Sequence, residues 1–144
     1  MRQKKPIAIQ KKIQVVFLLP MERRYLLFQV NEKRGGFWQN ITGSVEKNES
    51  FYEAALREIN EETGLSPDEY TLHDLKIEHR FRTRHPRIIC EKSFVATFEE
   101  KPIITLSDEH QACCWFHFHE MKNVNYGYES NFRSLIYGMS YANF

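Results

Sequence analysis

The sequence lacks a cysteine framework. It has only three cysteines in 144 residues, Cys90, Cys113 and Cys114. The count is odd, two are adjacent and no CxxC spacing occurs, so neither a disulfide scaffold nor a zinc site of that type is expected. Cys113 and Cys114 lie in the apolar run ACCWF, which predicts reduced thiols in the core or in strands.

The chain also lacks a long apolar run and an excess of charge of one sign. No hydrophobic stretch approaches the length of a membrane span. The formal net charge of +1 implies no general attraction to nucleic acid or to a membrane surface. The basic N-terminal stretch, MRQKKPIAIQKK, is not followed by the long apolar segment and small-residue cleavage site of a secretory signal, so a cytoplasmic location is expected.

Internal repeats, low-complexity segments and linkers are absent too. With 144 residues, 42% hydrophobic, the chain suits a single domain spanning residues 1–144. Period-two and apolar runs predict strands at residues 13–19, 24–30, 72–82, 88–98 and 112–118, with a connection at 84–87 and a C-terminal helix at 130–141. Gly35-Gly36 predicts a turn that leads into residues 37–42. Strands on both sides of a central helix, with a second helix at the end, favour an α/β fold in which helices enclose a mixed sheet.

The central helix is predicted from the segment GSVEKNESFYEAALREINEETGL, residues 43–65. Asn48 and Ser50 are both suitable N-terminal caps, and Ser50 with Glu53 fits a capping box. Gly64 is a left-handed C-terminal cap. The helical spacing of its apolar positions predicts a buried stripe of Tyr52, Ala55, Leu56, Ile59 and Thr63.

Three carboxylates give this helix its chemistry. Glu58, Glu61 and Glu62 fall within an arc of about 100°, since a helix turns by about 100° per residue. Glu58 and Glu62 repel each other as an i,i+4 pair. A divalent cation such as Mg²⁺, which prefers carboxylate oxygen, turns that repulsion into attraction. The segment therefore predicts a metal site beside the buried stripe.

The segment is also similar to a known family motif. The residues at its fixed positions are Gly43, Glu49, Arg57, Glu58, Ile59, Glu61, Glu62, Gly64 and Leu65. This is the Nudix box, and the chain resembles the Nudix hydrolases. Asn48 stands where members often have glycine, and asparagine tolerates the left-handed conformation. The resemblance implies a Nudix-type α/β/α sandwich with a mixed β-sheet and a catalytic loop–helix–loop. It also implies an enzyme that cleaves a diphosphate bond in a nucleoside diphosphate linked to another group.

The same resemblance implies roles for the box residues. The implied ligands of Mg²⁺, or of Mn²⁺, are the carboxylates of Glu58, Glu61 and Glu62 and the backbone carbonyl of Gly43. Glycine lets the backbone pass close to the metal. Arg57 matches the box arginine and is expected to orient a box carboxylate, that of Glu49.

A further acidic residue precedes the last predicted strand. Many family members carry a glutamate in a loop shortly before a strand with tryptophan, and Glu109 with Trp115 fits that place. Glu109 is predicted to bind the metal or to act as general base on the attacking water. Asp108 competes for this role. The alternative is a polar loop with a turn cap, because Ser-Asp-Glu is common in such loops.

Residues 37–46, FWQNITGSVE, give an indication of the substrate. This stretch is similar to one in the dihydroneopterin triphosphate pyrophosphatases, Nudix enzymes that release pyrophosphate from a pterin triphosphate. Phe37 and Trp38 are predicted to stack on a flat heterocycle, and Gln39 or Asn40 to read its hydrogen-bonding edge. The alternative is that the two aromatics belong to the core or to a strand edge.

A basic stretch, HRFRTRHPR, occupies residues 79–87. Arg80, Arg82 and Arg84 have the two-residue period of a strand and line one face if the strand persists. Arginine forks grip phosphate well, so these three are candidates for a polyphosphate clamp. The alternative is a hairpin end with solvated charges. The stretch suits an RNA 5′ end equally well.

The sequence thus predicts a metal-dependent pyrophosphohydrolase whose partner is a small, nucleotide-like polyphosphate, either dihydroneopterin triphosphate or a nucleoside triphosphate. Dinucleoside polyphosphates and RNA 5′ ends are the alternative substrates. A non-catalytic nucleotide-binding module is the alternative of another class, but such modules usually lose box glutamates and this chain keeps them all. The oligomeric state stays open, a homodimer included.

Overall fold

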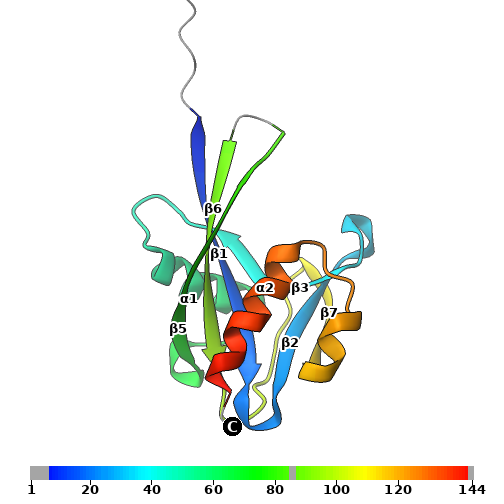
Figure 1. Cartoon of the computed structure of the whole chain (residues 1–144). Helices are drawn as coiled ribbons and strands as arrows, with labels where there is room; N and C mark the ends of the chain where they lie inside the picture. The colour runs from blue at the N-terminus through cyan, green and yellow to red at the C-terminus, as the bar shows by residue number, and fades with distance from the viewer. Residues whose placement is uncertain (1–6, 85–86, 143–144) are drawn as a thin grey trace, which may run out of the picture.

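The computed structural model describes residues 7–84 and 87–142. Within them, a seven-stranded sheet lies between two α-helices, α1 on one face and α2 on the other (Figure 1). The strands are β1 (Ala8–Leu19), β2 (Arg24–Val30), β3 (Trp38–Gln39), β4 (Ile41–Ser44), β5 (Thr71–Arg82), β6 (Arg87–Thr97) and β7 (His110–His117). The helices are α1 (Phe51–Thr63) and α2 (Glu129–Gly138), with short 3-10 turns at Pro20–Glu22, Glu32–Arg34, Pro67–Glu69, Phe118–Asn123 and Met139–Tyr141.

The sheet is mixed, as predicted. Its main path runs β3-β2-β1-β6-β5, while β4 pairs with β1 and β7 pairs with β2. The β1–β6 pair is parallel and the other pairs are antiparallel. The long strands β1, β6 and β5 extend beyond the body of the molecule (Figure 1). The predicted connection at 84–87 includes residues 85 and 86, which lie outside the described residues.

Two hydrophobic cores lie on the two faces of the sheet. Because successive side chains of a strand point to opposite faces, alternate residues of β1 enter different cores. Ile13 and Phe17 pack on the α1 side, together with Ile59 of the helix. Val16 packs on the α2 side, together with Leu135. The α/β/α layering expected from the sequence is therefore present.

Helix α1 begins and ends where its capping residues predict. Ser50 is the N-cap, with both hydrogen bonds of the capping box, and Gly64 caps the C-terminus in a left-handed conformation. Asn48 is not the cap, but it adopts the left-handed conformation with φ of 67°. The predicted stripe was wrong at Tyr52, which is 47% exposed. The buried face is rotated toward Ala54, and it also includes Glu58 and Glu62.

The segment at residues 37–42, which follows the predicted turn, is divided between two neighbouring strands of the sheet. The segment forms two short strands, β3 against β2 and β4 against β1, separated at Asn40. Asn40 is fully buried, and its amide nitrogen donates to Oε1 of Gln14 at 2.7 Å. Its backbone N–H donates to Oδ1 of Asn131 at 2.8 Å. These bonds hold the chain where it leaves one neighbouring strand for another.

Helix α2 is shorter than predicted. It ends at Gly138, before a 3-10 turn. Leu135 is fully buried, whereas Ile136 is 46% exposed. Asn131 and Ser134 are buried as well, since the sheet offers polar partners: Oγ of Ser134 lies 2.9 Å from Oγ of Ser93.

The structure also bears on the predictions about cysteines and membrane spans. All three cysteines are free thiols, and Cys90 is buried, Cys113 partly buried and Cys114 exposed. In residues 7–84 and 87–142, no helix has the length and apolar character needed to cross a membrane.

Candidate active site

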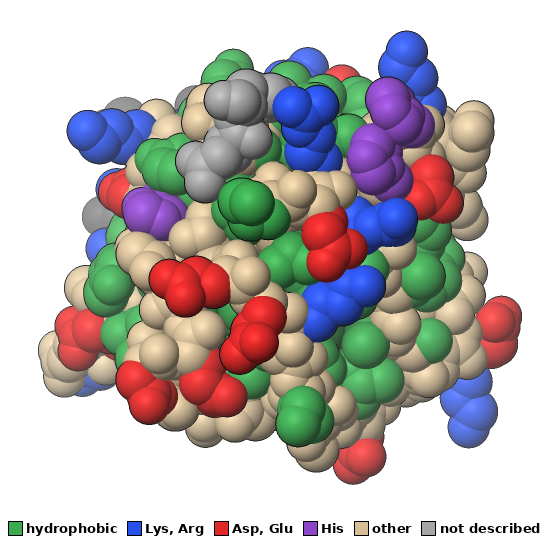
Figure 2. All heavy atoms as spheres, turned by 90° about the horizontal axis from the view of Figure 1, so that it is seen from below, with side chains coloured by type: hydrophobic (Ala, Val, Ile, Leu, Met, Phe, Trp, Pro, Cys, Tyr) green, Lys and Arg blue, Asp and Glu red, His purple; other side chains and the backbone are tan. Residues whose placement is uncertain are grey.

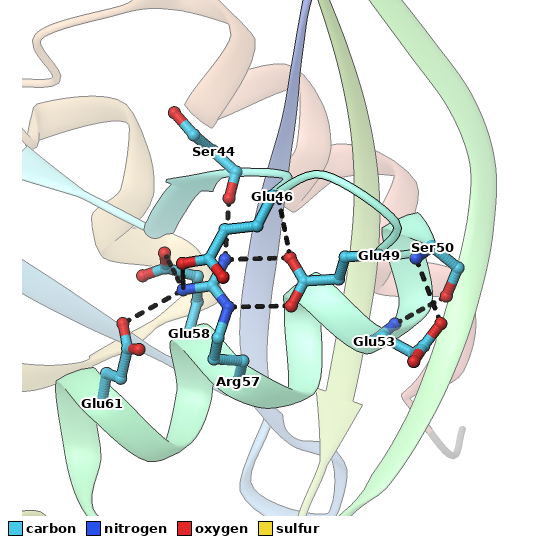
Figure 3. Close-up of polar contacts among 8 residues, drawn as sticks. All are labelled: Ser44, Glu46, Glu49, Ser50, Glu53, Arg57, Glu58 and Glu61. Carbon is cyan, nitrogen blue, oxygen red and sulfur yellow. Dashed lines mark hydrogen bonds and ion pairs between the residues drawn. The ribbon is translucent and has the colours of Figure 1, made fainter.

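Arg57 is the centre of the polar network on α1 (Figure 3). Its Nε and Nη2 donate to the two carboxylate oxygens of Glu49 at 2.8 and 3.0 Å. Its Nη1 contacts Glu58 at 2.9 Å and Glu61 at 3.2 Å, and Nη2 also donates to the carbonyl of Ser44 at 2.8 Å. The expected contact between Arg57 and Glu49 is present. Arg57 thereby links β4, the loop and the helix through hydrogen bonds.

Glu49 fixes the loop that precedes the helix. One oxygen of its carboxylate accepts from the backbone N–H of Glu46 at 3.0 Å (Figure 3). The hydrogen bond from Arg57 holds the pKa of Glu49 below its usual range. Glu49 is therefore ionised and occupied by the arginine, which makes its role structural within the site.

Glu58 lies directly against Gly43. The residue is 9% exposed, and this burial raises its pKa to about 7 although the neighbouring Arg57 opposes the shift. A Cβ added to Gly43 would lie 2.2 Å from Cδ of Glu58. Only glycine leaves room for this carboxylate, because any side chain at position 43 would occupy the space in which Glu58 lies between the strand and the helix.

Glu62 is held from the other side of the site by the loop before β7. Oγ of Ser107 donates to Oε2 of Glu62 at 2.6 Å, and the backbone N–H of Ser107 reaches the carbonyl of Glu62 at 3.3 Å. Nδ1 of His110 lies 3.1 Å from the same Oε2. Burial alone raises the pKa of Glu62, but the His110 and Ser107 contacts outweigh it and the pKa is lowered.

Sequence reasoning did not single out Ser107 or His110. Both flank the acidic pair of the same loop, and His110 is the first residue of a strand. A serine and a histidine next to acidic residues are common in loops, so only the fold reveals that they reach Glu62.

Glu109 joins the same group. Its carboxyl lies beside Glu62, and partial burial, followed by the charge of Glu62, raises its pKa. Its backbone N–H is 3.4 Å from Oγ of Ser107. Asp108 takes part through its backbone carbonyl, which accepts from Nδ2 of Asn31 at 2.7 Å. These contacts favour Glu109 over Asp108 as the loop carboxylate of the site.

The donor set suits a hard divalent cation, but the side chains do not converge on one point. Among the residues that the structure describes, no three His, Cys, Asp or Glu side chains form a cluster that would hold a metal. Arg57 draws Glu58 and Glu61 toward itself, and the Glu61 side chain is 53% exposed. Carboxylate oxygens are the ligands that Mg²⁺ prefers, and the open backbone at Gly43 is a close-approach position.

The predicted substrate-binding aromatics pack against protein. The ring of Phe37 meets that of Tyr128 edge-on, with centroids 5.9 Å apart. Trp38 meets Phe116 edge-on at 5.1 Å and belongs to the core on the α2 side. Gln39 differs, because its Nε2 lies 3.1 Å from Nε2 of His110 and so reaches the glutamate group. Stacking of Phe37 or Trp38 on a heterocycle stays a prediction.

The arginines of β5 differ from Gly43 in their position along the strand direction of the sheet. Register pairs Arg82 with Ile88, and Ile88 with Ile9, whereas Gly43 pairs with Ile13. Four residues of β1, about 13 Å along the strand, separate the register of Arg82 from that of Gly43. Arg80 pairs with Cys90, and Cys90 with Lys11, so two residues separate Arg80 from the register of Gly43. The described partner of Arg80 is Glu78, at 3.3 Å. Arg84 lies still further along the hairpin, and the phosphate clamp stays a prediction.

Several hollows of the described chain lie outside the glutamate group, and two of them bear on the substrate prediction. One, of about 410 Å³, lies between β5 and the start of α2 and is lined in part by His79, Phe81, Tyr128, Ser130 and Arg133, with Arg80 at its side. The other, of about 640 Å³, lies where β5 begins and β6 ends, and Asp68, Glu69, Glu99 and Glu100 are among its lining residues. The face seen in Figure 2 shows acidic side chains gathered over one part of it. Because like charges repel, the hollow at the start of β5, with its four acidic lining residues, is unsuited to a polyphosphate.

Comparison with known proteins gives the same family as the box. The profile of the NUDIX domain matches residues 10–135. An octanoyltransferase of Myxococcus xanthus is 38% identical over 97 residues, 65% of this chain and 26% of that protein. An 8-oxo-dGTP diphosphatase of Proteus vulgaris is 43% identical over 51 residues, 35% of this chain and 45% of that protein. The chain thus aligns with less than half the length of either relative.

A solved structure extends the similarity to nearly the whole chain. The dihydroneopterin triphosphate pyrophosphohydrolase of E. coli superimposes with a TM-score of 0.79 and 25% identity, covering 94% of this chain and 99% of that one. The expected sandwich fold is confirmed. Since the domain profile spans most of the chain, and the box glutamates with their arginine are in place, the chain belongs to the Nudix family.

Proposed function

We propose that the chain is a Mg²⁺-dependent pyrophosphohydrolase of a small, nucleotide-like polyphosphate. One observation carries the proposal: Glu62 of α1 and Glu109 of the β7 loop, which come from separate segments, lie beside each other, and Glu58 of the same helix lies against Gly43. Neighbouring carboxylates repel each other unless a cation or a proton is shared between them.

The residues of the site have separable roles. When bound, a divalent cation screens the phosphate charges and acidifies a water molecule. Glu58 and Glu62 would hold the cation, together with the carbonyl of Gly43. Arg57 keeps Glu49 and Glu58 in place and leaves the loop before α1 rigid. Mn²⁺ has the same preference for oxygen and is expected to substitute for Mg²⁺.

Glu109 is the proposed general base. Replacement of Glu109 by glutamine is expected to lower kcat by about a hundredfold with little change in KM, because proton removal matters only in the transition state. Raising the pH is expected to restore part of the rate, since hydroxide then replaces the base. Steady-state kinetics from pH 7 to 9.5 measure both effects. The matched change Asp108→Asn is expected to leave kcat nearly unchanged, and equal losses in the two variants contradict this role.

The proposed substrate is dihydroneopterin triphosphate or a nucleoside triphosphate. Two similarities support it: the FWQNITGSVE stretch at residues 37–46, and the likeness to the E. coli pyrophosphohydrolase. The hollow beside α2 has an aromatic and polar lining that suits a heterocycle, while its two arginines, Arg80 and Arg133, are paired with Glu78 and Glu129. Phe37 supports its wall through Tyr128.

A substrate panel tests the proposal. Purified protein with Mg²⁺ is incubated with dihydroneopterin triphosphate, the nucleoside triphosphates including 8-oxo-dGTP, a dinucleoside polyphosphate and a 5′-triphosphate RNA, and the products are separated. We expect the highest kcat/KM, with release of pyrophosphate, for one of the triphosphates. Preference for the dinucleoside or RNA substrate selects those alternatives, and binding without turnover of any substrate indicates a non-catalytic module.

A further inference from the structure

His110 bridges two parts of the site that the sequence does not connect. Its side chain is 2% exposed. Its Nδ1 lies 3.1 Å from Oε2 of Glu62, and its Nε2 lies 3.1 Å from the amide nitrogen of Gln39. The ring also packs against Phe28, with centroids 5.4 Å apart. The imidazole therefore joins β3, in the predicted substrate-binding stretch, to a predicted metal ligand on α1.

A β-bulge turns His110 toward this position. Ala112 pairs with Gln29, but His110 pairs with Val30, so Gln111 is an extra residue in β7. In a regular strand His110 would share a face with Ala112. The bulge moves it to the opposite face, where α1 packs, and Gln111 stabilises the bulge by donating to the carbonyl of Val30 at 3.2 Å. Bulges that reorient a side chain are frequent beside active sites.

Hydrogen-bonding rules determine where the imidazole carries its proton. The amide nitrogen of Gln39 can only donate, so Nε2 of His110 must accept and carries no proton. The proton is then on Nδ1, which faces a carboxylate oxygen of Glu62 that can only accept. Gln39 thus sets the tautomer that His110 presents to Glu62.

Two of the partners of Glu62, Ser107 and His110, contact the same carboxylate oxygen. Oγ of Ser107 donates to Oε2 at 2.6 Å, and Nδ1 of His110 lies 3.1 Å from that atom. The Nδ1–H bond does not point at Oε2. Nδ1 is therefore a buried polar atom without a well-aligned hydrogen-bond acceptor, although it lies close to Glu62. A small rotation of the carboxylate aligns the bond, and the oxygen left outside these contacts is Oε1.

We propose that His110 is a positioning residue for the metal ligand Glu62. By donating from Nδ1 to Oε2, it fixes the carboxylate so that Oε1 is presented to the cation, and Gln39 fixes the tautomer needed for this. The inference rests on the proposed function, because it requires Glu62 to be a ligand. Partners that orient a ligand in this way typically contribute 10- to 100-fold, roughly, to metal affinity.

Mn²⁺ affinity tests the proposal without turnover. Binding is measured by the electron paramagnetic resonance signal of free Mn²⁺ for the unsubstituted protein, His110→Phe and His110→Asn. We expect His110→Phe to weaken binding by at least about tenfold. His110→Asn, whose amide nitrogen takes the place of Nδ1, is expected to bind within about threefold of the unsubstituted protein. The exposed His119 provides the control, since His119→Phe is expected to leave the affinity unchanged.

The tautomer gives an independent readout. Nitrogen-15 NMR of the imidazoles in the unsubstituted protein is expected to show the His110 proton on Nδ1, whereas a proton on Nε2 overturns the proposal even if His110→Phe fails to fold. Equal Mn²⁺ affinity of His110→Phe and the unsubstituted protein overturns this inference alone. Absence of Mn²⁺ binding in the unsubstituted protein contradicts the proposed function and, with it, the inference.

Discussion

Replacing Glu62 by glutamine is expected to lower kcat by at least about a hundredfold while the fold stays intact. The change keeps the size of the side chain and one acceptor oxygen for Ser107. It removes the negative charge, and a neutral amide is a poor ligand for a hard cation. Steady-state kinetics with Mg²⁺ measure the loss, and thermal unfolding followed by circular dichroism measures the stability.

Glu53→Gln is the matched control for this change. Glu53 lies on the same helix, outside the glutamate group, and accepts from the backbone N–H of Ser50 at 3.1 Å. Glutamine keeps that capping bond, so we expect nearly full activity. If Glu53→Gln lowers kcat as much as Glu62→Gln does, the ligands have been assigned to the wrong residues.

Adding one methyl group at Gly43 is expected to have an effect of similar size. In Gly43→Ala the new Cβ would lie 2.2 Å from Cδ and 2.3 Å from Oε1 of Glu58. The carboxylate must move, and its 2.9 Å contact with Arg57 must change. Small displacements of reacting groups cost about a hundredfold in rate. We therefore expect kcat to fall by about that factor, with a loss of roughly 1–3 kcal/mol in unfolding free energy from overpacking.

The neighbouring substitution Ser44→Ala is the matched control for Gly43→Ala, because it changes the same strand without adding an atom next to Glu58. Ser44 is one residue further along β4, and its hydroxyl makes an exposed hydrogen bond with Gln10 at 3.0 Å. Its loss is expected to change kcat by less than about threefold, since exposed hydrogen bonds contribute little. Full activity of Gly43→Ala would show that the carboxylate of Glu58 need not stay where the structure places it.

Local signals in the sequence were sufficient to predict the limits of α1. The Ser50–Glu53 capping box and Gly64 give the limits of α1, because capping depends on residues within one turn. The pairing of Arg57 with Glu49 was also predictable, since both belong to one motif. The buried face was not predicted in full, because Tyr52 has the right spacing but the sheet leaves it exposed.

Long-range packing decides the parts that sequence could not give. The break at Asn40 depends on Gln14 and Asn131, which are far away in the chain. His110 reaches Glu62 only because a bulge reverses its orientation, and a one-residue irregularity has no periodic signature. The period-two arginines of β5 were read correctly as a strand, but their level relative to Gly43 depends on the sheet register.

The most direct measurement of the central claim is metal-dependent release of pyrophosphate. Protein freed of metal with a chelator is mixed with the best triphosphate of the substrate panel, and pyrophosphate is followed as Mg²⁺ is added back. The account predicts no turnover without metal, full recovery with Mg²⁺ or Mn²⁺, and no recovery in Glu62→Gln. Full turnover by metal-free protein would contradict a mechanism built on Glu58, Glu62 and Glu109.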